Sequence, residues 1–600
     1  MSKQQRIQRD QRGQCGQHHT RHEHHGPRRH DDHEQRDHHD RHSRHDRHDH
    51  PPHGKPHPPH ARFGRHGHHV QREQQREWHE RQQQQRRHPR FKDAYDVIVV
   101  GSGVGGMTAA LELANNDVDV LLLEQHNLTG GYASSFVRGR YEFEVSLHEL
   151  CECGDGTNGA SFGGVRTILD SLGVFPEYVR VPDAYRVILS KWGIDFTMPF
   201  GIENAIAAIE ELEPGQGPKV RNLFTLCGEI YDALMYIQSS DMNPNPLVMA
   251  TKYSSFLRTA AYSVEDVYNA LGFSPLTKDL MSAYYGYVTR RLDKTSFTVW
   301  ALMLYLYIRD GAHIINKTSH ALAIDMEMRL RELGAQVETD VAIVGLLVEN
   351  GAVIGVETSS GEQMYARRVL CNLSPNTVFA KMMPHGTVPE EALRLTGART
   401  LGASPFGVYL GLDALPEEMG IESYELFFSE DMDTARIYEL SRRWQISTKI
   451  SVTCPDIAIP GLTGPDRCQM NFTCLYDPEA MVGHTGASGY QRNKEEFTDG
   501  LITLFESITG ARIREHIEEI EIATPATYVH YSGTPFGNIY GYEMTVLDGI
   551  VPRTLRIREE QYVPGLDFVG GFGRRAHGFC SSITNGYDTA RDTLKILGGE

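Results

Sequence analysis

The chain has 600 residues, 40% of them hydrophobic and 23% charged, with a formal net charge of −18 and nine cysteines. This length predicts several domains, and the composition is that of a chain that buries a sizeable core. The acidic balance disfavours a nucleic-acid-binding enzyme, and the cysteines are too sparse for a disulfide scaffold. The most apolar run, Phe297–Ile308, is about half of the roughly 20 residues that a membrane-spanning helix needs.

Residues 1–92 form a low-complexity segment that holds 21 of the 30 histidines. With almost no aliphatic side chains, such a segment cannot offset its chain entropy by burial, so we predict a disordered tail. Neighbouring imidazoles such as His24-His25 could bind a divalent metal; the alternative is a solvated tail with incidental metal affinity. The tail resembles neither a secretory signal nor a transit peptide. We therefore expect a cytoplasmic protein, with peripheral contact to a membrane left open.

Order begins near residue 93 with the signature of a dinucleotide site. Tyr95–Val100 predicts a buried parallel strand, residues 107–115 predict a helix, and residues 118–123 predict a second strand that ends at Glu124. Between the first strand and the helix lies a G-x-G-x-x-G motif, made of Gly101, Gly103, Gly105 and Gly106. Such glycines let a pyrophosphate approach the helix N-terminus, and the acid accepts hydrogen bonds from ribose hydroxyls. The carboxylate favours FAD or NAD over NADP, whose 2′-phosphate it would repel.

A second glycine element follows the acid at once. It is similar to the corresponding element of FAD enzymes of the glutathione-reductase-like superfamily, which includes amine oxidases and phytoene desaturases. The resemblance implies FAD, with the chain passing close to the phosphates and the ribityl chain. The residues assigned to the cofactor here are Gln125, Gly130, Gly131, Ser134, Ser135 and Arg138. Arg138 would face a phosphate; the alternatives are a solvated surface arginine, or Arg140 in its place.

The far end of the chain is expected to return to the cofactor. Residues 564–573 predict a strand that enters a turn containing Gly570 and Gly571, and Ser581-Ser582 predicts the cap of a final helix that stops at Gly598-Gly599. The helix N-terminus, with Ser582 and Ile583, would direct its N–H groups at the electron-rich carbonyl of a flavin.

Together these ends resemble the phytoene desaturase, carotenoid isomerase and retinol saturase group of flavoproteins. Residues 533–543 look like its G-x-I-Y-G-x-E element, and residues 348–356 predict a hairpin around Asn350-Gly351. By position in the family, the backbone of Ile343 would contact the adenine. The chain departs from the family at Lys317-Thr318, where a Gly pair is usual, and at Gly571, where an acid or amide is usual.

The resemblance places two histidines where the chain should border the flavin ring. His148 and His577 are the candidate acid/base residues, because imidazole titrates near neutrality; the alternative for each is a structural histidine. Tyr540 is a third candidate proton donor, and Glu149 could act itself or orient His148. The Cys151-x-Cys153 pair is expected to be buried cysteine, with a redox or metal role as the alternative. We predict no metal site in residues 93–600.

The predicted architecture is an α/β fold: a Rossmann-like FAD-binding domain of the glutathione-reductase-like type with a discontinuous α+β substrate domain. The predicted segments are a tail at 1–92, FAD-binding parts at 93–154, 311–390 and 550–600, and substrate-domain parts at 155–310 and 391–549. The predicted function is FAD-dependent desaturation, saturation or isomerisation of a C=C bond in an apolar polyene- or lipid-like molecule. Its electron donor or acceptor is left open. The alternatives are a flavin amine oxidase and a metal-binding protein that acts through the tail.

Overall fold

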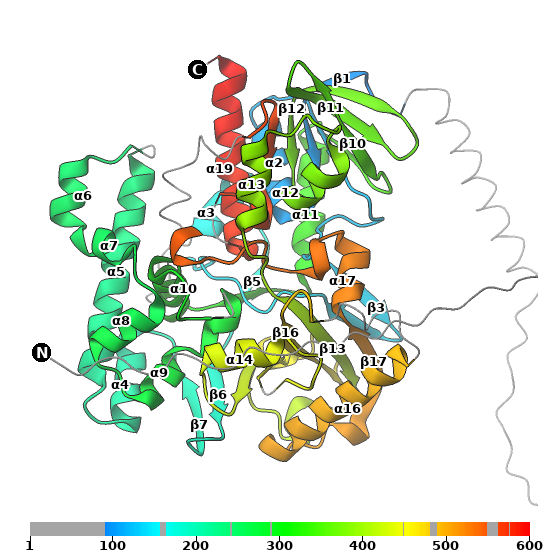
Figure 1. Cartoon of the computed structure of the whole chain (residues 1–600). Helices are drawn as coiled ribbons and strands as arrows, with labels where there is room; N and C mark the ends of the chain where they lie inside the picture. Colours follow the sequence, from blue (N-terminus) through cyan, green and yellow to red (C-terminus); the bar gives the residue numbers. More distant parts are fainter. Residues whose placement is uncertain are drawn as a thin grey trace, which may run out of the picture. The chain divides into compact units, whose positions relative to one another are not determined.

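A computed structural model describes residues 90–156, 164–240, 243–288, 291–447, 449–480, 489–548, 562–574 and 577–599. The predicted disorder and metal binding of the tail fall on residues 1–92, which lie outside the described residues except for the last three. The described residues form two large sheets with helices on and between them (Figure 1), so the predicted α/β class is confirmed.

The first sheet has the strand order β10-β11-β12-β1-β2-β9, with β18 paired to β12. Its strands are β1 (Ala94–Val100), β2 (Val120–Leu123), β9 (Gln336–Glu338), β10 (Ile343–Glu349), β11 (Ala352–Thr358), β12 (Gln363–Cys371) and β18 (Leu566–Phe568). Strands β9, β2, β1, β12 and β18 are parallel neighbours. The end of β1, residues 97–100, is fully buried, as parallel strands covered on both faces must be.

Helices from both ends of the chain cover this sheet. They are α2 (Val104–Ala114), α3 (Gly164–Ser171), α11 (Ser319–Glu332) and α19 (Phe579–Gly598). Every residue of α2 is buried, because α11 and α19 pack against it (Figure 1). The contact with α19 is close: a Cβ added to Gly586 would lie 2.2 Å from the carbonyl oxygen of Gly105. The first strand–helix unit of the described chain is thus completed by its last helix.

The second sheet has the order β17-β13-β16-β15-β14-β6-β7. Its strands are β6 (Tyr185–Leu189), β7 (Ile194–Met198), β13 (Ser404–Leu412), β14 (Glu425–Ser429), β15 (Ile450–Thr453), β16 (Cys468–Tyr476) and β17 (Ile517–Ala523). Its pairs are antiparallel except β14 with β6. Two small sheets add β3 (Ser135–Arg138) with β4 (Tyr141–Glu144), and β5 (Tyr178–Arg180) with β8 (His313–Ile315).

A helical region follows β7 and packs around α10 (Phe297–Asp310). Its other members are α4 (Ile202–Leu212), α5 (Gly217–Ser239), α6 (Pro246–Lys252), α7 (Ser254–Thr259), α8 (Val264–Leu271), α9 (Pro275–Met281) and the 3-10 helix η1 (Ala283–Tyr287). Trp300 of α10 is fully buried and donates its N–H to the Tyr268 hydroxyl at 2.7 Å. No helix among the described residues is long and apolar enough to cross a membrane.

The remaining helices connect the two sheets or cover their edges. They are α12 (Pro375–Thr377), η2 (Val378–Met382), α13 (Glu390–Ala398), η3 (Pro416–Met419), α14 (Thr434–Ser441), α15 (Pro455–Ala458), α16 (Tyr490–Thr509), η4 (Arg514–His516), α17 (Pro525–Ser532), η5 (Pro535–Gly537), η6 (Val546–Asp548) and η7 (Gly570–Phe572). Among these, α16 packs its buried face, which includes Phe497 and Leu501, on the second sheet.

The hairpin and the last helix, each predicted from a short stretch of sequence, are both present. The hairpin of β10 and β11 turns at Asn350 and Gly351, whose φ values of 52° and 80° are those of the predicted left-handed turn. The prediction for α19 needs a correction. The helix begins at Phe579 after the N-cap Gly578, whose φ is 91°, so Ser582 lies in the first turn and does not cap the helix. The division into domains stays a prediction.

Candidate active site

A cavity of about 1290 Å³ is lined by residues of both large sheets, α10 and the N-terminus of α19. Most of the predicted site residues line it. They are Gly101, Gly103, Gly105, Glu124, Gln125, Gly130, Gly131, Ser134, Ser135, Arg138, His148, Ile343, Tyr540, Gly570, Gly571, His577 and Ser582. The exceptions are Gly106 and Ile583. A Cβ on Gly106 would lie 2.2 Å from the oxygen of Gly101, and Ile583 of α19 is fully buried in a hydrophobic core; their contact with the cofactor stays a prediction.

Three glycine elements meet at one end of this cavity. A Cβ on Gly105 would lie 2.5 Å from the Cα of Gly570, and one on Gly131 would lie 3.0 Å from the Cα of Gly103. Gly101 adopts a φ of +95°, which L side chains rarely adopt. The first glycine motif, the second glycine element and the C-terminal turn are thus in van der Waals contact, although they are far apart in sequence.

Glu124 stands at the end of β2 with a defined orientation. Its carboxylate accepts hydrogen bonds from the Ser102 amide at 2.8 Å, the Ser102 hydroxyl at 2.7 Å and the His126 amide at 2.9 Å. The side chain is buried yet lines the cavity. Each carboxylate oxygen can accept more than one hydrogen bond, so these contacts fix the acid and leave capacity for ribose hydroxyls.

The cavity has the features that a dinucleotide needs. Helices α2 and α19 both begin at glycine N-caps, Gly103 and Gly578, without a side-chain cap hydrogen bond. Their first N–H groups and their dipoles therefore favour an anionic or electron-rich group. Gly571 lines the cavity, and a Cβ added there would meet nothing within 4 Å. The residues present thus fit a cofactor that lies against bare backbone.

The surroundings of Ile343 and Arg138 bear on the cofactor contacts predicted for them. Ile343 lines the cavity from the first residue of β10, so it belongs to the hairpin and not to a strand before it. Arg138 lines the cavity too, but its Nε donates to the Glu521 carboxylate at 2.6 Å. A cofactor phosphate would compete with this carboxylate, which weakens the predicted role of Arg138.

The other end of the cavity holds His148 within a buried polar cluster. Its Nδ1 lies 3.6 Å from the Glu425 carboxylate, and its Nε2 lies 3.3 Å from the Thr473 hydroxyl. Glu425 on β14 also accepts hydrogen bonds from Ser451 at 2.5 Å and Tyr287 at 3.2 Å. The Glu425 side chain is 0% exposed and that of His148 is 16% exposed. The imidazole is thus anchored by a buried carboxylate while it stays open to the cavity.

Two further ionisable groups, Glu149 and Lys449, line the cavity beside this cluster. Burial raises the pKa of Glu149 well above its usual range, and the nearby charge of Glu425 raises it further. Burial lowers the pKa of Lys449 to about 8, although Glu425 opposes the shift. The Lys449 ammonium lies 4.2 Å from the centre of the Phe427 ring. A carboxyl group with a raised pKa and an ammonium group whose pKa is lowered to about 8 therefore share the cavity wall with His148.

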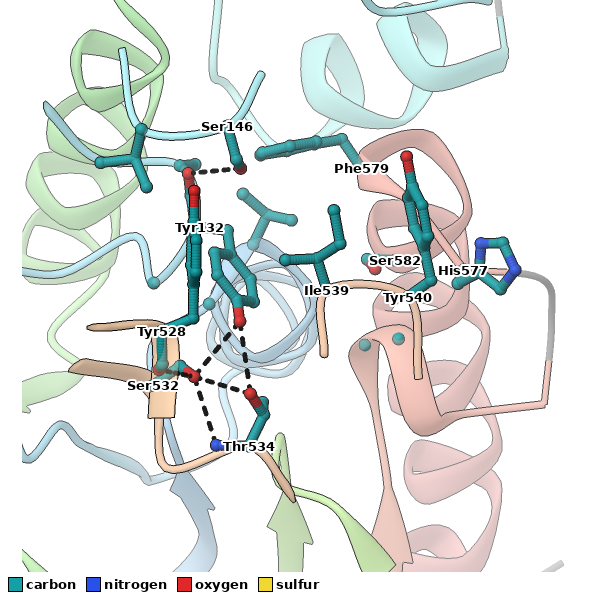
Figure 2. Close-up of a pocket in the computed structure, with 18 of the residues that line it drawn as sticks. Tyr132, Ser146, Tyr528, Ser532, Thr534, Ile539, Tyr540, His577, Phe579 and Ser582 are labelled. Atoms are coloured by element: carbon teal, nitrogen blue, oxygen red, sulfur yellow. Dashed lines mark hydrogen bonds between the residues drawn. The ribbon is translucent and has the colours of Figure 1, made fainter. Parts of the chain in front are cut away.

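His577 and Tyr540 lie together on another wall (Figure 2). Their ring centres are 4.8 Å apart at an interplanar angle of 34°, and Ser582 of α19 is drawn beside Tyr540. Burial raises the pKa of Tyr540, and Glu425 raises it further, so its phenol stays protonated. The two predicted histidines are thus both brought to the cavity, and His148 lies 3.6 Å from the Glu425 carboxylate.

A hydroxyl-rich corner of the cavity was not predicted. The Tyr132 hydroxyl contacts Ser532 at 3.2 Å and Thr534 at 3.3 Å, and it donates to the Asn538 carbonyl at 3.2 Å (Figure 2). The Ser146 hydroxyl donates to the Tyr132 carbonyl at 3.3 Å. These contacts tie the second glycine element to the segment after α17.

The remaining wall is apolar. Helix α10 contributes Val299, Leu302, Met303, Leu306 and Tyr307, and η1 contributes Tyr285 and Tyr287. The three tyrosines Tyr285, Tyr287 and Tyr307 therefore face the cavity, while the neighbouring Trp300 and Tyr284 are fully buried in the core. Within the described part of the chain, no group of three His, Cys, Asp or Glu side chains could hold a metal ion.

Comparison with known proteins agrees with this geometry. Residues 99–162 match the NAD(P)-binding Rossmann-like domain family. The chain is 22% identical to an all-trans-retinol 13,14-reductase of Danio rerio, over 82% of this chain and 85% of that protein. It is 20% identical to a prolycopene isomerase of Daucus carota, over 76% and 75%. The chain is a homologue of these proteins. The predicted resemblance to the carotenoid isomerase and retinol saturase group is therefore confirmed.

Solved structures show that the likeness extends to the fold of this chain. An oxidoreductase of Methanosarcina mazei aligns with a TM-score of 0.57 at 14% identity, covering 83% of this chain and 100% of its own. A putrescine oxidase variant aligns with a TM-score of 0.57 at 14% identity, covering 84% and 99%. These confirm the predicted Rossmann-like architecture, and they add nothing about the substrate.

Three residues in or behind the cavity wall carry no signal that could have been read in the sequence. Asn372 follows β12, and its side chain is close to Gly103 and Gly570. Glu425 and Lys449 are single charged residues beside β14 and β15. The strand order of the second sheet brings Glu425 to within 3.6 Å of His148 and places Lys449 in the cavity wall. A charged residue at the end of a strand with apolar neighbours is a weak hint at best.

Proposed function

We propose that this chain is an FAD-dependent oxidoreductase that acts on a carbon–carbon double bond of an apolar, polyene-like small molecule. The observation that carries the proposal is the cavity itself. Glycine elements and two uncapped helix N-termini form one end, and apolar side chains of α10 with His148 form the other. The names of the homologues, a retinol 13,14-reductase and a prolycopene isomerase, support a substrate of this class.

FAD is the dinucleotide that this end of the cavity fits best. Gly103 and Gly131 would hold its phosphates, Glu124 its adenosine ribose, and the residues around Ile343 its adenine. The N-terminus of α19, with Ser582, would face the flavin. NAD alone would leave the second glycine element and the C-terminal turn without a partner. Bound flavin supplies hydride or electron transfer; the protein has to orient the substrate, exclude water and move a proton.

His148 is the residue that we assign to proton transfer. It is open to the cavity, and Glu425 at 3.6 Å would stabilise its imidazolium. In a saturation, His148 would protonate the carbon next to the one that receives the hydride. In a desaturation, it would accept the proton from that carbon. Glu425 does not line the cavity and acts through His148 as a positioning residue. His577 and Tyr540 would then shape the cavity near α19.

A flavin amine oxidase is the rival function, and the fold alone is compatible with it. Lys449 argues against it. With a pKa of about 8, its ammonium is mostly charged at neutral pH, and a second cation in the same cavity would be repelled. A metal-binding role of the tail, a cytoplasmic location and contact with a membrane surface stay predictions.

The test is the visible spectrum of the purified full-length protein before and after anaerobic reduction with dithionite. We expect the two absorption bands of oxidised flavin, their bleaching on reduction, and their return when a polyene is added but not when an amine is added. His148→Gln should keep the bands and slow this reoxidation by about a hundredfold, the usual scale of a lost acid or base. His577→Gln is the matched control and should slow it much less.

Each alternative result has a clear reading. A colourless protein that takes up no added FAD contradicts the cofactor assignment. Flavin that is reoxidised by amines and not by polyenes supports the rival function. Equal effects of the two histidine variants, or a larger effect of His577→Gln, contradict the role given to His148.

A further inference from the structure

We propose that Cys151 and Cys580 form a redox-active dithiol–disulfide pair that carries electrons between an external thiol and the bound flavin. The proposal rests on the assignment of FAD made above. It concerns the electron donor, which the homologues' names leave open. The Cys151-x-Cys153 motif was noted in the sequence, but its third partner, Cys580, is 429 positions away from Cys151.

Three cysteines meet at the carbonyl group of Cys151, beside the cavity. The Cys580 Sγ donates a hydrogen bond to the Cys151 carbonyl oxygen at 3.3 Å, and the Cys153 Sγ donates to the same oxygen at 3.3 Å. The neighbouring Cys580 side chain and burial raise the pKa of the Cys151 thiol well above its usual range. Cys151 and Cys580 are therefore neighbouring cysteines, and no disulfide joins them in the described state.

Their place in the fold points to a flavin and not to plain core packing. Both Cys151 and Cys580 line the cavity, whereas Cys153 is fully buried and does not. Cys580 lies in the first turn of α19, two residues before Ser582, at the helix end assigned to the flavin. It is the least buried of the described cysteines, so a thiol that enters the cavity would reach it first.

A second cysteine pair supplies an internal contrast. Cys454 and Cys468 are also neighbours, but both are 1% exposed or less and belong to the core of the second sheet. Neither lines the cavity. Such a pair has no path for an external reductant or for a cofactor. The distinction between the two pairs is accessibility to the cavity, which makes Cys454→Ser the matched control variant.

The chemistry balances with the flavin as oxidant and a low-molecular-weight thiol as reductant. In the dithiol, two S–H bonds break and one S–S bond forms, while two electrons and two protons pass to oxidised flavin. An external thiol then attacks Cys580 Sγ of the disulfide and releases the Cys151 thiol. A second external thiol frees Cys580 and leaves as the external disulfide. The net result is reduced flavin at the expense of two external thiols.

The test maps disulfides in the full-length protein across mixtures of reduced and oxidised dithiothreitol. Samples are quenched with acid, alkylated, digested and analysed by mass spectrometry, a readout that needs no turnover. We expect a Cys151–Cys580 cross-linked peptide with a two-electron transition, in which about 30 mV changes the dithiol-to-disulfide ratio tenfold. Cys454→Ser should leave this transition unchanged, and Cys580→Ser and Cys580→Ala should abolish it.

A second readout links the pair to the flavin. Anaerobic dithiothreitol should bleach the bound flavin at least tenfold more slowly in both Cys580 variants than in the wild type and in Cys454→Ser. Dithionite, which needs no thiol, should bleach all four proteins alike, which shows that the variants fold and hold FAD. No cross-linked peptide at any potential, a peptide that contains Cys153 instead, or bleaching at the wild-type rate would overturn the proposal. Reoxidation of the dithionite-reduced variants by polyenes would in that case still support the proposed function.

Discussion

The buried ammonium of Lys449 makes a prediction that can be worked through in numbers. The side chain is 7% exposed and stacks on two aromatic rings, at 4.2 Å from the centre of Phe427 and 5.2 Å from that of Tyr285. Burial lowers its pKa from 10.5 to about 8. At about 1.36 kcal/mol per pKa unit, this shift costs roughly 3 kcal/mol of folding free energy wherever the unfolded lysine and the folded one are both charged.

The sign follows from proton linkage. Between pH 8 and pH 10.5 the unfolded chain holds the proton and the folded protein has lost it, so stability rises with pH across this window. Below pH 8 the full cost is present; above pH 10.5 it is gone. Lys449→Met removes the titration. As the pH rises from 8 to 10.5, the free energy of unfolding of the wild type should therefore increase by roughly 3 kcal/mol relative to that of Lys449→Met.

The assay is urea unfolding of both proteins, followed by circular dichroism, at half-unit steps from pH 7 to pH 10.5. Tyrosines and cysteines that titrate in the same range are present in both proteins and cancel in the difference. Lys252→Met, at an exposed lysine, is the control and should run parallel to the wild type. A difference between the wild type and Lys449→Met that stays constant over this range would refute the argument.

Three further predictions concern a glycine, a histidine and a strained lysine. Gly571→Val should leave the far-ultraviolet spectrum unchanged and lower flavin content at least tenfold, because a side chain there meets only open cavity; full flavin content would contradict it. Burial, with the charge of Arg180 second, lowers the pKa of His313 to about 4. As the pH falls from 6.5 to 4, the free energy of unfolding of the wild type should therefore drop by up to roughly 3 kcal/mol more than that of His313→Gln; an equal drop in both proteins would refute this. Lys317 adopts a φ of 80°, so Lys317→Gly should raise the free energy of unfolding by about 1 kcal/mol in a denaturant titration; an unchanged or lower value would count against strain.

The part of the site that binds the dinucleotide could be predicted because its signals are local. The run Val97–Val100, the glycines after it and Glu124 stand in one stretch, and each residue type is required by the backbone or by the cofactor. The structure adds that Gly105 touches Gly570, which no local pattern states. The C-terminal helix was predicted, but its start was placed wrongly at Ser581-Ser582, because a glycine with positive φ began the helix without a side-chain cap.

The catalytic end of the cavity could be predicted only in part. His148 was found because the resemblance places it where the chain borders the flavin ring. Glu425, which lies 3.6 Å from His148, and Lys449 were missed, because the pairing of β14 with β15 sets their positions and the alternation of side chains does not reveal that pairing. Cys580 was missed as the partner of Cys151 for the same reason: only the packing of α19 brings them together.

The glycine contact between Gly105 and the segment of Gly570 and Gly586 has a consequence for how the protein is made. Ribosomes deliver β1 and α2 first and α19 last, yet α2 is buried on one side by α19. Until residues 566–598 emerge, the nascent chain keeps an apolar helix face and one edge of β12 uncovered. Such surfaces invite aggregation and chaperone binding. Because the C-terminal turn completes the glycine cradle, the cofactor cannot be fully held until residues 566–598 have emerged, and one docking event then closes both the core and the site.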